Sequence, residues 1–348
     1  MQRLFLSFVI LLSAVCARAQ GNPEAQQLVN QGIELHDKGE YEAAIRKYDQ
    51  AIKLDDNYFN AWYEKMYSLY EWGKKKECIS IAKDVLKKFP DNPGLRHVYI
   101  QYGSSLDDIG KPEEAIEIYD KGISLYPDEY LLHFNKGLTL QRLEKNEEAL
   151  LCYQQSLRLK PLHSSSNLYT GMLLQQTNKI PALLAYATFL AIEPRSGRSE
   201  DAFRRAENIM WGNIKKEGDK TTILMDASVL KAAKDKNGEN DFVSVEMIFV
   251  LSGASSKELD SLTKTPVGKL SFRLQMLINS LAESKKNKKG FYWEHYVPFF
   301  IEMKKKDMVE TLANLMYLKT NGEEGMKWLE ENEAKVDAFY DWVKSYRW

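Results

Sequence analysis

The chain contains few residues that interrupt or cross-link regular structure. It has 10 prolines, 19 glycines and three cysteines in 348 residues. So few prolines and glycines exclude collagen-like and linker-dominated chains, and three cysteines are too few for a disulfide scaffold. The formal charge is −1, so the positive excess typical of nucleic-acid-binding proteins is missing. We therefore expect no nucleic-acid partner.

The remaining composition favours a folded, helical protein. Hydrophobic residues make up 44% of the chain, charged residues 28% and aromatic residues 11%. These proportions allow a packed core and argue against extensive disorder.

The first nineteen residues have the features of a secretory signal. Arg3 precedes an apolar run from Leu4 to Val15, and the segment closes with Ala17-Arg18-Ala19. A positive head, a short apolar stretch and an A-x-A ending predict export with cleavage after Ala19. The run is shorter than the roughly 20 residues of a membrane-spanning helix, so we expect no transmembrane segment in the mature chain. The ending favours the periplasm of a Gram-negative bacterium, or secretion.

The cysteines leave one alternative for the N-terminus. Lipid attachment at Cys16 is conceivable, but Val15 precedes it where such processing favours Gly, Ala or Ser, so simple cleavage is preferred. Cys78 and Cys152 fall on apolar helix faces, which predicts free thiols buried in the core.

Residues 25–195 follow a period of 34 residues. The pattern has a mid-helix glycine, an alanine eleven or twelve residues later, a tyrosine four residues after the alanine, and a closing proline. These positions are Gly32, Gly103, Gly137 and Gly171; Ala44, Ala115, Ala149 and Ala182; Tyr48, Tyr119, Tyr153 and Tyr186; and Pro90, Pro127, Pro161 and Pro194. A small residue lets two helices approach closely, and the tyrosine fills the space beside it. Such hairpins bury their apolar faces only by stacking.

This pattern resembles the tetratricopeptide repeat family. The resemblance covers about half of the chain and implies five units, 25–58, 59–92, 96–129, 130–163 and 164–195, stacked in an α-α superhelix. Met66 and Cys78 depart from the pattern in the second unit, where small residues are usual. The fold class predicted for the whole chain is all-α.

Residues 196–348 are also predicted to be helical, as a C-terminal domain that resembles no family we recognise. Helices are expected from Ser199 to Met210 or Lys215, over 224–233, 242–251, 291–305, 307–319 and 323–346, and from Pro266 onward. Val243 to Val245 could instead begin a strand. The last sixty residues are rich in aromatic side chains, whose spacing of three and four favours a helical core over a binding platform.

A search for chemistry finds no nucleotide, metalloprotease or serine-hydrolase motif. The five histidines are never spaced as metal ligands, so we predict no metal site, no cofactor and no catalytic residue. Glu294-His295 is the one place where a hidden catalytic pair is conceivable.

The resemblance implies that the first helices of successive units line a concave groove that holds a partner protein or peptide. The side chains carried over to this groove are Asn60, Tyr63, Tyr67, Tyr70, His97, Ile100, Phe134, Leu138 and Arg142. Val29 and Ile33 stand where relatives that grip a carboxylate have polar clamp residues, so that clamp is absent. Filling of the groove by the chain's own C-terminal helices remains an alternative, because an exposed apolar stripe requires a cover.

These features predict a non-enzymatic interaction or scaffold protein of the cell envelope. Two alternatives stay open: an enzyme with its active site in 196–348, and an outer-membrane protein that captures glycans.

Overall fold

The computed structural model describes residues 22–348 except 213, 218–219, 224–239, 255–263 and 287. Residues 1–19, predicted to be a signal, lie outside the described part, as does the helix predicted over 224–233. The chain divides into two compact units, residues up to Cys152 and residues from Tyr153 onward. Each unit is described by itself below.

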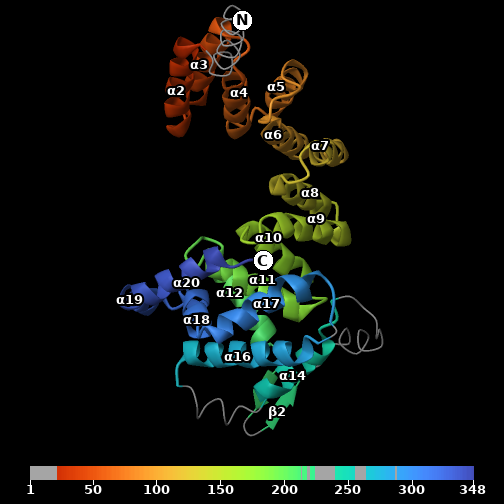
Figure 1. Cartoon of the computed structure of the whole chain (residues 1–348), viewed down its shortest axis with the longest axis vertical. Helices are drawn as coiled ribbons and strands as arrows, with labels where there is room; N and C mark the ends of the chain where they lie inside the picture. Colours follow the sequence, from red (N-terminus) through yellow and green to blue (C-terminus); the bar gives the residue numbers. More distant parts are fainter. Residues whose placement is uncertain (1–21, 213, 218–219, 224–239, 255–263, 287) are drawn as a thin grey trace, which may run out of the picture. The chain divides into compact units, whose positions relative to one another are not determined.

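The first unit is a series of antiparallel helix pairs (Figure 1). Its helices are α2 (Pro23–Asp37), α3 (Tyr41–Leu54), α4 (Phe59–Glu71), α5 (Lys75–Lys88), α6 (Leu95–Asp108), α7 (Pro112–Leu125), α8 (Tyr130–Arg142) and the start of α9 (Asn146–Leu159). Each contacts the next along the chain from α2 to α8. This is the arrangement that the repeat pattern predicts.

Left-handed residues separate the two helices of each pair. Gly39, Gly73 and Gly110 have φ angles of 77° to 78°, a conformation that glycine adopts without a steric penalty. Glu144 takes the same place after α8 with a φ of 60°. The chain therefore reverses direction at the same point in four successive pairs.

The predicted contact between glycine and tyrosine is confirmed. A Cβ atom added to Gly32 or Gly103 would overlap the ring of Tyr48 or Tyr119, and one added to Gly171 would come within 2.9 Å of the Tyr186 ring. The tyrosines at these positions are at most 1% exposed, as are the four alanines of the pattern. The close approach of the paired helices thus depends on the missing side chain.

The departures from the pattern in the second pair are also buried. Met66 and Cys78 are fully inaccessible, and the Ser105 hydroxyl donates to Cys78 Sγ at 3.2 Å. Both Cys78 and Cys152 are free thiols, as predicted, although Cys152 is only partly buried.

The second unit contains the rest of α9 and the helices that follow. These are α10 (Ser164–Leu174), α11 (Lys179–Ile192), α12 (Ser199–Trp211), α14 (Val243–Ala254), α16 (Pro266–Ser284), α17 (Phe291–Lys305), α18 (Val309–Tyr317), α19 (Gly322–Glu331) and α20 (Glu333–Ser345). Residues 180–191 of α11 are all buried, because α10, α12, α14, α17 and α18 surround this helix. The predicted fifth repeat, 164–195, thus shares a compact unit with the C-terminal helices.

The helical fold class is confirmed, with a small departure. Ile214–Glu217 (β1) and Lys220–Ile223 (β2) pair as an antiparallel hairpin, which the sequence analysis did not predict. Consecutive β-branched residues from Thr221 to Ile223 favour a strand there. The strand considered at 243–245 is wrong, since these residues begin α14, and the helix predicted over 323–346 is broken at Asn332.

The C-terminal aromatic residues form a core, as their spacing predicts. Phe291, Trp293, Tyr296, Phe299 and Phe339 are at most 4% exposed. Among the described helices, none combines the length and the apolar composition that a bilayer crossing needs.

Candidate partner-binding face

Three aromatic rings lie along one side of α4. Phe59, Tyr63 and Tyr67 are spaced by four residues, which places them on successive turns of one helix face. The ring centroids of Phe59 and Tyr63 are 6.2 Å apart, and those of Tyr63 and Tyr67 are 6.4 Å apart with an interplanar angle of 1°. The rings are therefore nearly parallel.

Helices α2 and α6 extend this row on either side. The His36 ring stacks on Tyr67 with centroids 5.0 Å apart and an interplanar angle of 20°, and the His97 ring lies 6.1 Å from Tyr63. His36 Nδ1 is 2.7 Å from the buried hydroxyl of Ser68, which fixes the ring position. We call this set the ring ladder: His36, Phe59, Tyr63, Tyr67 and His97.

The predicted groove residues nearest the ladder keep accessible surface. Asn60 and His97 are exposed, and Tyr63 and Tyr67 are half-buried. Tyr70 is half-buried in a different setting: Lys75 Nζ lies 3.0 Å from its ring centroid and bonds Asp108 at 2.9 Å. Tyr70 is therefore already occupied by contacts within the unit.

Apart from His97, the predicted residues on α6 and α8 are buried, half-buried or held by other contacts. Ile100 and Phe134 are 9% and 8% exposed, so we expect them to pack in the core beneath the face rather than contact a partner. Arg142 Nη2 donates at 2.6 Å to the buried carboxylate of Asp107, which also accepts from Thr139. Leu138 is half-buried. The side chains that ring contacts join into an accessible set are those of the ladder, and the exposed Asn60 lies on the same helix, α4.

Acidic side chains surround the ladder and affect its titration. Burial, with the Glu64 carboxylate and Tyr67 adding to it, raises the pKa of Tyr63 to about 12. The pKa of Tyr67 is raised by burial and then by Glu71 and Glu64. Burial and the nearby Asp37 raise the pKa of Glu64. The face therefore combines aromatic rings with nearby negative charge.

The sequence analysis missed Phe59, Ser68 and Glu64. The spacing 59, 63, 67 could have revealed Phe59. The sequence carries no signal for Ser68, because its role depends on the approach of His36 from another helix.

The Glu294-His295 pair does not form a catalytic constellation. His295 lies between aromatic rings, with Phe291 at 4.7 Å and Trp348 at 4.7 Å between centroids. Its Nε2 atom is buried without a hydrogen-bond partner, and burial lowers its pKa to about 3. Glu294 is exposed and its carboxylate accepts from the Gly290 amide at 3.4 Å. The two side chains therefore serve separate local roles.

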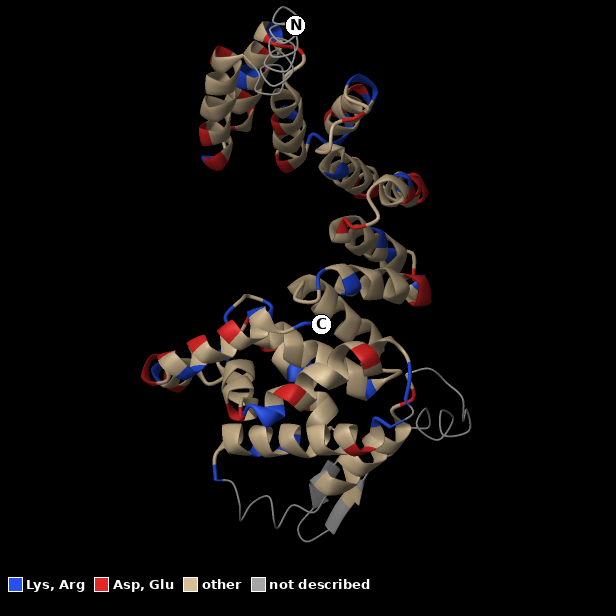
Figure 2. Ribbon diagram, viewed as in Figure 1, with Lys and Arg blue, Asp and Glu red and all other residues tan. Residues whose placement is uncertain are grey.

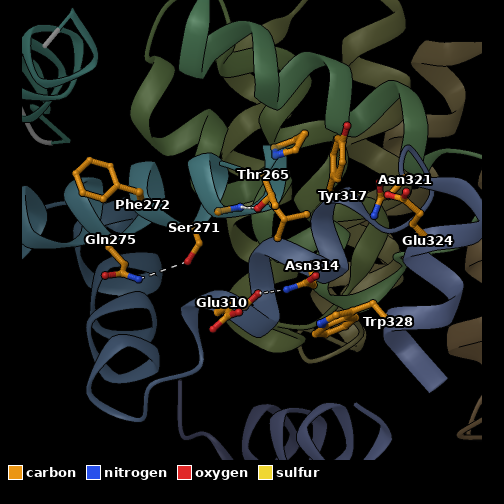
Figure 3. A pocket seen from close by; sticks show the side chains of 13 residues that line it. Thr265, Ser271, Phe272, Gln275, Glu310, Asn314, Tyr317, Asn321, Glu324 and Trp328 are labelled. Carbon is orange, nitrogen blue, oxygen red and sulfur yellow. Dashed lines mark hydrogen bonds between the residues drawn. The ribbon is translucent and has the colours of Figure 1, made fainter. Parts of the chain in front are cut away.

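A pocket of about 560 Å³ in the second unit shows no hydrogen-bonded nucleophile–base pair among its described lining residues (Figure 3). It lies between α16, α18 and α19 and includes the rings of Phe272, Tyr317 and Trp328. No histidine, cysteine, lysine or arginine is among its described lining residues. The hydrogen bonds drawn there, such as Asn314 to the Glu310 carbonyl at 2.9 Å, lie within single helices. The described chain also holds no group of three acidic, histidine or cysteine side chains arranged for a metal ion.

Comparison with known families agrees with the helix pairs of the first unit. A family model described as TPR repeat matches residues 32–70, and one described as tetratricopeptide repeat matches residues 97–129 and 131–161. This chain contains tetratricopeptide repeats. The matched stretches cover most of α4 and of α6–α8, so the ring ladder is built largely from recognised repeat helices.

Individual repeat proteins resemble the chain at low identity. The small glutamine-rich tetratricopeptide repeat-containing protein 2 of Mycosarcoma maydis is 29% identical over 119 residues, which are 34% of this chain and 32% of that protein. The chain therefore spans about a third of this curated relative.

Two solved structures are similar in part. A thermophilic TPR protein of Thermus thermophilus, TTC0263, is 20% identical, with a TM-score of 0.43 over 53% of this chain and 98% of that chain. PilF of Pseudomonas aeruginosa is 18% identical, with a TM-score of 0.44 over 62% of this chain and 93% of that chain.

Proposed function

We propose that this protein is a non-enzymatic interaction protein that holds a segment of another polypeptide on the first helices of its repeats. The observation that carries the proposal is the ring ladder, where α2 and α4 present nearly parallel, half-buried rings and α6 adds the tilted, exposed ring of His97. Tyrosine suits such a face because it offers a large contact area with a polar tip and few rotatable bonds.

The ladder keeps accessible ring surface that a partner could cover, in addition to the contacts that stabilise the unit. Phe59 already packs edge-on against Phe89 at 5.5 Å, so this end of the ladder is anchored in the unit. Tyr67 stacks on Tyr63 and on the partly buried His36 and remains accessible. Covering an aromatic ring on binding contributes on the order of 1 to 3 kcal/mol. Two or three such rings would suffice for a specific, reversible contact.

The absence of an enzymatic role is part of the same proposal. It is supported by the different contacts of Glu294 and His295 and by the lack of hydrogen-bonded nucleophile–base pairs among the described residues that line the pocket of the second unit. No specific observation favours glycan capture, since the aromatic side chains of α17 and Phe339 are buried in the core and those of Tyr340, Trp342, Tyr346 and Trp348 are half-buried.

Site-specific photo-crosslinking tests the proposal. A benzoylphenylalanine in place of the exposed Asn60 should crosslink to a polypeptide in cells that express the full chain. The same replacement at Leu151, an exposed position on α9, is the control and should yield no such adduct.

A second comparison links the adduct to the rings. Tyr67→Leu should reduce the adduct at position 60 several-fold, because the ring surface is lost, while the helix signal in circular dichroism and the melting temperature change little. Equal crosslinking from positions 60 and 151 would reject the ladder as the binding face. A large drop in melting temperature would instead identify Tyr67 as a core residue.

A further inference from the structure

Within the proposed function, on which this inference rests, the chemistry around the ring ladder points to the kind of segment that it holds. We propose that the bound polypeptide presents an arginine side chain, which stacks on the rings of Tyr63 and Tyr67 and pairs with the carboxylates beside them. The argument rests on charge, on ion pairing and on ring geometry.

The two helices that carry most of the ladder are strongly acidic. Helices α2 and α4 contain five acidic residues and one lysine: Glu24, Glu34, Asp37, Glu64, Glu71 and Lys65. The Lys65 ammonium is bonded to Asp49 at 2.6 Å, so it does not neutralise the face. Acidic positions mark both helices in Figure 2. A cationic partner complements this charge.

The carboxylates closest to the rings have no cation of their own. Within the described residues, Asp37, Glu64 and Glu71 form no ion pair, although most other first-unit helices are linked by such pairs. Glu64 is only half exposed, and a partly desolvated carboxylate gains most from a cation that arrives with a partner. The pKa of Glu64 is raised by burial and by the nearby Asp37, and a cation beside it would oppose both effects.

The ends of the helices add to the same field. Asp37 is the last residue of α2 and Glu71 the last residue of α4. The C-terminal end of a helix carries partial negative charge, which favours a nearby cation. Lys38 follows α2 and is exposed, as Asp37 and Glu71 are, so solvent screens all three charges and the half-buried Glu64 contributes most to the field at the rings. His36 and Tyr67 lie in these final turns, where the two helix ends come together.

The ring geometry distinguishes arginine from lysine. Tyr63 and Tyr67 are parallel to within 1°, and His36 continues the stack at 20°. A planar guanidinium can lie on such rings and still donate two parallel hydrogen bonds to a carboxylate. An ammonium group has no plane to stack and is more strongly hydrated. We therefore expect arginine to bind more tightly than lysine at equal charge.

Fluorescence anisotropy with labelled hexapeptides tests the inference on the full chain. The probes are hexa-arginine, hexa-lysine and hexa-citrulline, the last being the neutral isostere of arginine. Hexa-arginine should bind about tenfold more tightly than hexa-citrulline and measurably more tightly than hexa-lysine at physiological ionic strength.

Matched variants separate the local site from the net charge. Glu64→Gln and Tyr67→Leu should each weaken hexa-arginine binding about fivefold. Glu117→Gln makes the same chemical change at an exposed position of α7, so it should alter binding by less than about twofold.

Several outcomes would overturn the inference. These are equal affinity for arginine and citrulline, equal or tighter binding of lysine, or equal losses from Glu64→Gln and Glu117→Gln. Crosslinking at position 60 combined with any of these results would retain the proposed function and reject arginine recognition. Absence of a crosslink at position 60 in the otherwise unchanged protein would reject the proposed function itself.

Discussion

At the scale of single residues, helix packing in the first unit depends on glycines, which have no side chain. Gly32 and Gly103 leave space that the rings of Tyr48 and Tyr119 occupy completely. A methyl group at either glycine would overlap the ring, and overpacking of this kind costs about 1 to 3 kcal/mol. The same pairing in successive repeats explains why the pattern is visible in the sequence.

His295 is a polar side chain that lies among aromatic rings. Burial, with a smaller contribution from Arg158, lowers its pKa from 6.5 to about 3. The unfolded chain therefore binds a proton between these values while the folded protein does not. The free energy of unfolding is therefore unaffected by His295 above pH 6.5. It decreases as the pH falls from 6.5 toward 3, because protonation then favours the unfolded chain.

His295→Phe should reduce the acid sensitivity of the protein. Phenylalanine keeps the aromatic contacts and does not titrate, so the loss of unfolding free energy from pH 7 to pH 5 should shrink by about 2 kcal/mol. Urea unfolding at both pH values measures the difference. His163, whose pKa burial lowers to about 4, remains in both proteins and cancels in the comparison. An unchanged pH dependence would contradict the buried neutral state.

At the scale of elements, Arg273 of α16 joins the end of α12 to the middle of α14. Its guanidinium donates to the Met210 carbonyl at 2.9 Å, near the end of α12, and to the Phe249 carbonyl at 2.7 Å in α14. The side chain is 1% exposed, and burial lowers its pKa to about 10. The Met210 carbonyl accepts because it lies in the last turn of its helix and lacks a partner there, and the Phe249 carbonyl accepts through a spare lone pair.

Replacing Arg273 with methionine should therefore destabilise the protein. Arg273→Met keeps much of the volume but leaves two buried carbonyls without these donors, at a cost of about 2 to 4 kcal/mol. Denaturant unfolding monitored by circular dichroism gives the change. Arg204→Met is the control, because Arg204 is exposed and bonded only to Asp201. Similar losses in both variants would refute the bridging role.

At the scale of the whole molecule, the compact units do not follow the repeat pattern. The pattern extends to residue 195, yet the chain separates into units after Cys152. Helices α10 and α11 have repeat-like sequences, but α11 buries its outer face against α12, α14, α17 and α18. The last predicted repeat thus serves as the core of the second unit.

Export is the prediction that concerns the whole chain. Intact mass spectrometry of the protein isolated from the envelope of an expressing Gram-negative bacterium should give the mass of a chain that begins at Gln20. The physical reason is the short apolar run followed by small residues at a cleavage site. A chain that begins at Cys16 and carries the mass of attached acyl groups would show lipidation instead. An uncleaved chain in the cytoplasm would contradict export.

Several features of the fold could be predicted from the sequence because they depend on local or periodic patterns. The helix from Phe291 to Lys305 has the predicted bounds, and α16 begins at Pro266 as expected from proline at a first helical position. The free thiols and the buried aromatic core also follow from spacing alone. The hairpin at 214–223 could not be foreseen, since short strands are set by their pairing partner.

The repeat is encoded in the order of the amino acids, because a glycine and a tyrosine at nearly constant separation form the same close helix contact at Gly32, Gly103 and Gly171. The shared face of Tyr63 and Tyr67 is encoded in the same way, since it follows from helical periodicity. Three-dimensional packing was needed to bring His36 onto the stack, to bury Ile100 and Phe134, and to place Arg273 between α12 and α14. These outcomes depend on how separate helices meet, and contacts between distant residues leave no periodic signal in one chain.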